Sequence, residues 1–101
     1  MHLLYQTQFF SSYQCDRQRC FYVDFGHKKV RLDFCQLLSL RHRLNRIRIE
    51  AHLEGNHPGL EILCLCNKAH LFVFNTTEIL ELMDLIKGTL GILELNSMVS
   101  C

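Results

Sequence analysis

The chain has 101 residues, of which 49% are hydrophobic, and its formal net charge is only +1. A chain of this length and composition forms a core but leaves little space for a deep catalytic cleft. We therefore expect a single domain over residues 1–101, and we favour a binding protein over an enzyme.

No stretch of the sequence has the roughly 18 consecutive apolar residues that predict a membrane span. The first residues, MHLLYQTQFFSSYQC, lack the basic segment, the apolar segment and the small-residue cleavage site of a signal peptide. We therefore expect a cytoplasmic protein without a membrane contact. In that compartment the six cysteines are expected to be reduced and to pack mainly as small hydrophobic side chains.

The first predicted elements are strands, and a helix follows them. Residues 5–13, YQTQFFSSY, are rich in strand-forming residues, and residues 20–25 alternate with a period of two. A turn and a further strand ending near Leu32 come next. Asp33 and Gln36 then have the spacing of a capping box, which predicts that a leucine-rich helix begins after Asp33.

A similar order of elements recurs 42 residues later in the chain. Residues 47–53, IRIEAHL, alternate as a strand does, and two strands joined by a turn follow, as in the first copy. Asn75 and Glu78 repeat the capping-box spacing. The sequence therefore predicts an α+β fold of two β-β-β-α repeats, at about residues 5–47 and 47–89. Its two helices are expected to pack on one face of an antiparallel sheet or sheets.

An apolar tail, residues 90–101, follows the second predicted helix. Ile92, Leu93 and Leu95 are too apolar to trail in water, so we expect them to dock on a neighbouring molecule. Arg41 falls within the apolar arc of the first helix, where it either extends to solvent or pairs with a carboxylate at an interface. With the open edges of a sheet, these features predict a non-enzymatic protein-interaction module that self-associates, most simply as a homodimer.

Basic residues are concentrated in the first half of the chain. Nine of the eleven Lys and Arg residues lie between Arg17 and Arg48, where only Asp24 and Asp33 oppose them. A basic block interleaved with Tyr and Phe is what a surface that follows a phosphate backbone requires, although the usual sequence signatures of nucleic-acid binding are absent. An alternative prediction is therefore binding of nucleic acid or another anionic ligand by Arg17, Arg19, Lys28, Lys29, Arg43 and Arg46.

Cysteine spacing gives a second alternative, a structural zinc-binding domain with Cys15 and Cys20 as ligands. These residues flank the segment DRQR and would present two thiolates together. We expect no cofactor as the simpler outcome, because cysteines also pack readily in protein cores. Catalytic motifs are missing from the sequence: it has neither a G-x-S-x-G elbow nor a glycine-rich phosphate loop.

Four features follow one another in the first half of the chain. They are the hairpin flanked by the two cysteines, a strand that ends in Phe25 and Gly26, a strand that ends near Leu32, and the leucine-rich helix. In this succession, over residues 13–45, the chain resembles short bacterial proteins that are grouped as a domain of unknown function. The resemblance implies a bacterial cytosolic protein with no assigned activity.

Overall fold

The computed structural model describes residues 2–15, 20–53, 59–65 and 70–99. Along the chain these residues form four strands, two helices, two further strands and a long helix. The elements are β1 (His2–Gln6), β2 (Ser11–Gln14), β3 (Phe21–Asp24), β4 (Lys29–Leu32), α1 (Phe34–Asn45), α2 (Ile49–Leu53), β5 (Leu60–Leu65), β6 (His70–Asn75) and α3 (Thr76–Val99). The mixed α+β class that the sequence predicts is confirmed.

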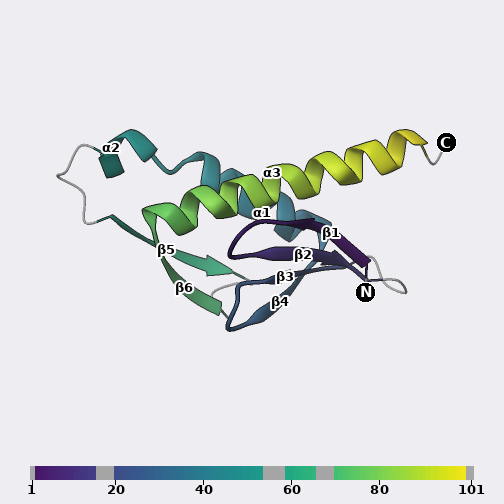
Figure 1. Ribbon diagram of the computed structural model, residues 1–101, viewed down its shortest axis with the longest axis horizontal. Coiled ribbons are helices and arrows are strands. Elements are labelled where there is room, and N and C mark those ends of the chain that lie inside the picture. Colours follow the sequence, from purple (N-terminus) through teal and green to yellow (C-terminus); the bar gives the residue numbers. More distant parts are fainter. Residues whose placement is uncertain (1, 16–19, 54–58, 66–69, 100–101) are drawn as a thin grey trace.

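Strands β1 to β4 form an antiparallel sheet in which each strand pairs with the next one along the chain. In β3 and β4 the residues alternate between a buried face and an outer face, and the buried face carries Phe21, Val23, Val30 and Leu32. Helix α1 packs against β4 and helix α3 packs against β1 and β2, on the buried face (Figure 1). Both long helices therefore cover the same side of the sheet.

Strands β5 and β6 form a separate antiparallel hairpin, which packs against one end of the four-stranded sheet. The contact is aromatic. The ring centre of Phe72 in β6 lies 4.3 Å from that of Phe25, which follows β3, and the ring centre of Phe74 lies 5.8 Å from that of Phe10, which precedes β2. Helix α3 contacts strands of both sheets and so holds the hairpin and the larger sheet together (Figure 1).

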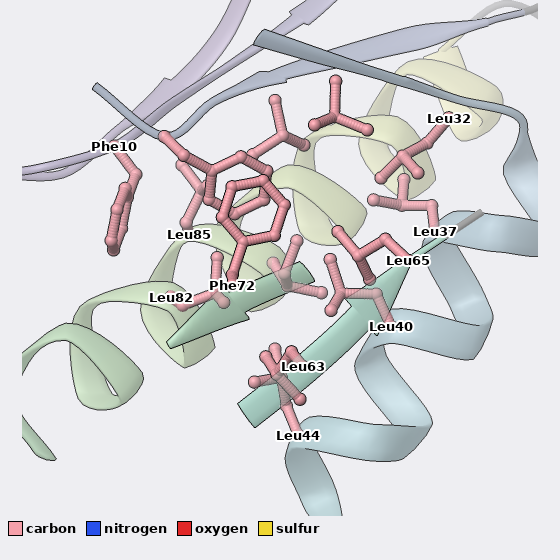
Figure 2. Packing of buried hydrophobic residues seen from close by; sticks show 14 of the residues in the cluster. Phe10, Leu32, Leu37, Leu40, Leu44, Leu63, Leu65, Phe72, Leu82 and Leu85 are labelled. Carbon is pink, nitrogen blue, oxygen red and sulfur yellow. The ribbon is translucent and has the colours of Figure 1, made fainter. Parts of the chain in front are cut away.

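A hydrophobic cluster fills the space between the two long helices, the larger sheet and the hairpin. Figure 2 shows side chains from all of these elements meeting there, among them Leu32, Leu40, Leu44, Leu63 and Leu82. Complete burial of one leucine contributes about 1.5–3 kcal/mol. The shared cluster therefore stabilises the positions of all these elements together.

Both long helices begin where their capping sequences predict. The Asp33 carboxylate accepts a hydrogen bond from the Gln36 backbone N–H at 2.7 Å, and the Gln36 side chain accepts one from the Asp33 N–H at 2.9 Å. Asn75 and Glu78 make the same reciprocal pair at the start of α3, with distances of 2.8 and 3.0 Å. The two predicted capping boxes are thus confirmed.

Two neighbouring residues fix α3 closely to the sheet. Gly88 lies against the ring of Tyr5 in β1, so close that a Cβ atom at this position would overlap the ring. The next residue, Thr89, is fully buried, and its Oγ1 lies 2.6 Å from Ser12 Oγ of β2 and 2.7 Å from the Leu85 carbonyl oxygen. A buried pair of hydroxyl groups therefore joins the sheet to the helix.

The predicted strand at residues 47–53 is wrong. Ile49–Leu53 forms the short helix α2, in which the side chain of His52 is buried. An alternation of apolar and polar residues over so few positions also fits a short helix. Here the contacts of His52 with distant residues, described below, place the segment in its helical form.

The predicted β-β-β-α repeat is not confirmed. Four strands precede α1, because residues 5–13 include parts of both β1 and β2 and the turn between them. Before α3, the helix α2 stands where the repeat requires a third strand. Helix α3 continues to Val99, so the predicted tail is helical from residue 90 to that point.

Candidate interaction surfaces

The β5–β6 hairpin exposes a patch of large aliphatic side chains. Ile62 lies directly opposite Val73 in the strand register, and Leu60 and Leu71 lie on the same face. The exposed fractions are 51% for Leu60, 64% for Ile62, 65% for Leu71 and 55% for Val73. These four residues are termed the hairpin patch.

The opposite face of the hairpin is buried in the core, so both faces of this two-stranded sheet are apolar. Sheets that are apolar on both faces are normally covered on both faces. Soluble monomers rarely leave contiguous aliphatic side chains in water, and the patch also lies on a sheet of only two strands, which is marginally stable by itself. The hairpin patch therefore has the properties of a contact surface.

A basic groove runs beside β5. It has a volume of about 540 Å³ and is lined by the C-terminal end of α1, by the segment that leads into α2 and by β5. Arg43, Arg46 and Arg48 line it together with Ile62 of the hairpin patch. The Arg43 guanidinium donates a hydrogen bond to the carbonyl oxygen of Cys64 in β5. The groove therefore places a positive rim next to the apolar patch.

The structure describes four of the predicted anion-binding residues, and it divides them between two places. Arg43 and Arg46 lie in the basic groove, where Arg48 joins them. Arg48 belongs to the basic block of the sequence but is not among the predicted ligands. Its proximity to Arg43 and Arg46 depends on the turn after α1, which the sequence does not reveal. Arg17 and Arg19 lie outside the described residues.

The two predicted lysines lie near the aromatic residues of the sheets. Lys28 Nζ is 5.8 Å from the ring centre of Phe72 in the hairpin, and Lys29 Nζ is 5.3 Å from the ring centre of Tyr13 in β2. Cations at such distances from aromatic rings are weakly stabilising at exposed positions. Lys29 belongs to the outer face of the four-stranded sheet, not to the basic groove.

The predicted interface residues are divided between the core and the surface. Arg41 is exposed and lines a groove of about 610 Å³ between α1 and α3, together with Glu94. Ile92 and Leu93 are half-buried and pack against the core of their own chain. Leu95 is 57% exposed, so it stays available for contact with another molecule. A role of these residues in an interface stays a prediction.

Cys15 and Cys20 lie opposite each other beyond the ends of β2 and β3. The Cys15 backbone N–H donates to the Cys20 carbonyl oxygen at 3.1 Å, and Cys20 is buried whereas Cys15 is partly buried. Among residues 2–15, 20–53, 59–65 and 70–99, no group of three or more His, Cys, Asp and Glu side chains could hold a metal ion. Zinc binding by the two cysteines stays a prediction that requires further ligands.

A buried histidine joins α2 to the hairpin and to α3. His52 Nε2 lies 2.8 Å from Glu61 Oε1 in β5, and His52 Nδ1 lies 2.8 Å from Thr76 Oγ1 at the start of α3. A hydroxyl, an imidazole and a carboxylate in a row have the composition of a catalytic triad. However, the His52 side chain is 0% exposed, and Thr76 Oγ1 also lies 3.5 Å from the Gly59 carbonyl oxygen. The arrangement therefore connects three elements of the fold through a buried imidazole.

Comparison with protein-family models, with curated proteins and with solved structures gives no match for this chain. The resemblance to bacterial proteins of unknown function therefore stays a prediction. No helix in the described part of the chain is long and apolar enough to cross a membrane. Function has to be inferred from the chemistry of the surfaces, since a fold alone does not specify it.

Proposed function

We propose that the protein is an interaction module that self-associates, with a second copy of the chain covering the hairpin patch. The observation that carries the proposal is the exposure of four large aliphatic side chains on one face of a two-stranded sheet. Sheets stack face to face at a spacing of about 10 Å, with the side chains of both faces interdigitating. Two hairpins stacked in this way would each supply the layer that the other lacks.

Charge placement favours a second copy as the occupant. The basic groove lies on the β5 side of the hairpin, whereas β6 leads into α3, whose N-terminal part carries Glu78, Glu81 and Asp84. A two-fold axis parallel to the strands places β5 of one copy over β6 of its partner. The basic groove of each copy then lies on the side where α3 of the other copy begins, so sides of opposite charge are brought together around the apolar contact.

A double substitution in the centre of the patch tests the proposal. Ile62→Glu combined with Val73→Glu places four carboxylates in the two-fold contact, where their burial without partners is strongly unfavourable. Sedimentation equilibrium is expected to give a dimer for the unmodified chain and a monomer for the double variant. Both positions are exposed within one chain, so circular dichroism is expected to show an unchanged fold.

Leu3→Glu is the matched control, because Leu3 is also an exposed aliphatic residue but belongs to β1 and not to the patch. Its mass in solution is expected to equal that of the unmodified dimer. A folded double variant that is still dimeric would disprove the role of the patch. An unmodified chain that is monomeric at every concentration would disprove self-association itself.

A further inference from the structure

The outer face of the four-stranded sheet carries aromatic and basic side chains in a row. The strand register places Leu3, Tyr13, Tyr22 and Arg31 side by side across the four strands. The strand residues next to Tyr22 and Arg31, such as Val23, are buried on the other face. Both long helices pack on that other face, so within the described part of the chain the row has no helix over it (Figure 1).

Two contacts show how Tyr13 lies on this face. Its hydroxyl is 3.3 Å from Ser11 Oγ, so the ring extends along β2 towards Ser11. Lys29 Nζ approaches the same ring from β4, at 5.3 Å from its centre. Tyr22 is the direct neighbour of Tyr13 in the register, and facing residues of adjacent strands have Cβ atoms about 5 Å apart. The two rings therefore provide adjoining aromatic surface beside a cation.

The charge on this face is mainly positive. Lys29 and Arg31 are exposed on β4. Among the residues of β1 to β4, Asp24 is the only acidic one, and its carboxylate accepts a hydrogen bond from the Gly26 backbone N–H at 2.8 Å. The acidic side chain is thus part of the turn after β3, and both basic residues of β4 lie on the outer face.

We infer that this face binds single-stranded nucleic acid. Every base has a flat π-face that stacks on an aromatic side chain, and a positive surface alongside attracts the phosphates. Tyr13 and Tyr22 would receive two bases, and Lys29 and Arg31 would contact the phosphates between and beside them. Four-stranded sheets with aromatic residues on an open face act in this way in other proteins. Here the strands follow one another in a simple meander, so the inference depends on the side chains and not on a likeness of fold.

Fluorescence anisotropy of labelled oligouridine and oligothymidine of equal length tests the inference. The unmodified chain is expected to bind at low salt, with a slope of log K against log salt of about −0.7 for each phosphate contacted. Tyr22→Leu is expected to weaken binding about five-fold or more, because one stacking surface is lost. Tyr22→Phe keeps the ring and is expected to keep the affinity. Comparison of the two oligonucleotides reports whether the sugar contributes.

Lys29→Glu and Lys87→Glu form a matched pair, because both lysines are exposed and the second belongs to α3 on the other side of the sheet. Only Lys29→Glu is expected to lower the affinity and flatten the salt dependence. Equal weakening by the two variants, or unweakened binding by Tyr22→Leu, would indicate general attraction of a polyanion and would overturn the inference. An absence of binding at low salt would also overturn it.

The nucleic-acid surface and the hairpin patch are separate, so the two proposals fail independently. The Ile62→Glu, Val73→Glu chain is expected to bind oligonucleotide with the affinity per chain of the unmodified protein. If that variant loses binding while it stays folded, the outer face of the sheet is not the site.

Discussion

A single glycine decides how closely α3 approaches the sheet. Gly88→Ala is expected to destabilise the protein by about 1–3 kcal/mol, because the added methyl group would overlap the ring of Tyr5. In the same helix, a Cβ atom at Gly91 would meet nothing within 4 Å, so Gly91→Ala is expected to stabilise by about 0.5–1 kcal/mol. Urea unfolding of the two variants measures both effects. Changes of the same sign would contradict the close packing of Gly88.

A second prediction at the scale of single residues concerns the buried hydroxyl groups of Ser12 and Thr89. Thr89→Val keeps the shape of the side chain but removes the partner of the Ser12 hydroxyl in the helix, at an expected cost of about 1–3 kcal/mol. Adding Ser12→Ala removes the other hydroxyl, so the double variant is expected to be more stable than the sum of the two single effects implies. A double-mutant cycle in urea measures this coupling. Strict additivity would mean that the two hydroxyl groups do not interact.

Helix α2 is expected to depend on His52. His52→Leu removes the hydrogen bonds to Glu61 and Thr76 while it keeps an apolar side chain of moderate size, at an expected cost of about 1–3 kcal/mol. Hydrogen exchange is expected to accelerate in Ile49–Leu53 and not in β1 to β4. His42→Leu, at an exposed position of α1, is the control and is expected to leave both regions unchanged. If hydrogen exchange in the His52→Leu variant accelerated equally in all elements, the role of His52 would not be confined to α2.

At the level of elements, local signals could be read from the sequence and long-range ones could not. The starts of α1 and α3 were predictable because each capping partner lies three residues from the other. Helix α2 was not, because His52 bonds to residues 9 and 24 positions away in the chain. The apolar alternation of residues 47–53 supported the wrong element because it carries no information about those partners.

The candidate surfaces also depend partly on local patterns, which the sequence shows, and partly on long-range contacts, which it does not. Apolar residues at consecutive positions of β5 and β6 are visible in the sequence and indicate strands that are apolar on both faces. The sequence does not reveal which of the two faces the core covers. The adjacency of Tyr13 and Tyr22 likewise depends on the register of β2 with β3, which the sequence does not reveal. The predicted basic ligands lie apart because Arg43 and Arg46 belong to the end of α1 whereas Lys29 belongs to β4.

For the whole molecule, the position of both long helices on one side of the sheet leaves the hairpin patch and the outer face of the sheet for partners. The charges proposed to meet around the hairpin patch make self-association sensitive to salt. We expect the dimer to dissociate more readily as the salt concentration rises, because exposed ion pairs are screened. Sedimentation equilibrium at two salt concentrations measures this. A dimer that is unaffected or tightened by salt would indicate a contact formed by apolar residues alone.

The central claim is that hairpin patches of two copies pack against each other, and isotope-filtered NMR on a mixture of labelled and unlabelled chains tests it most directly. The two-fold arrangement predicts intermolecular contacts between the methyl groups of Ile62 in one copy and Val73 in the other. Intermolecular contacts that involve Leu95 and leave the hairpin patch untouched would contradict the account and would assign self-association to the end of α3.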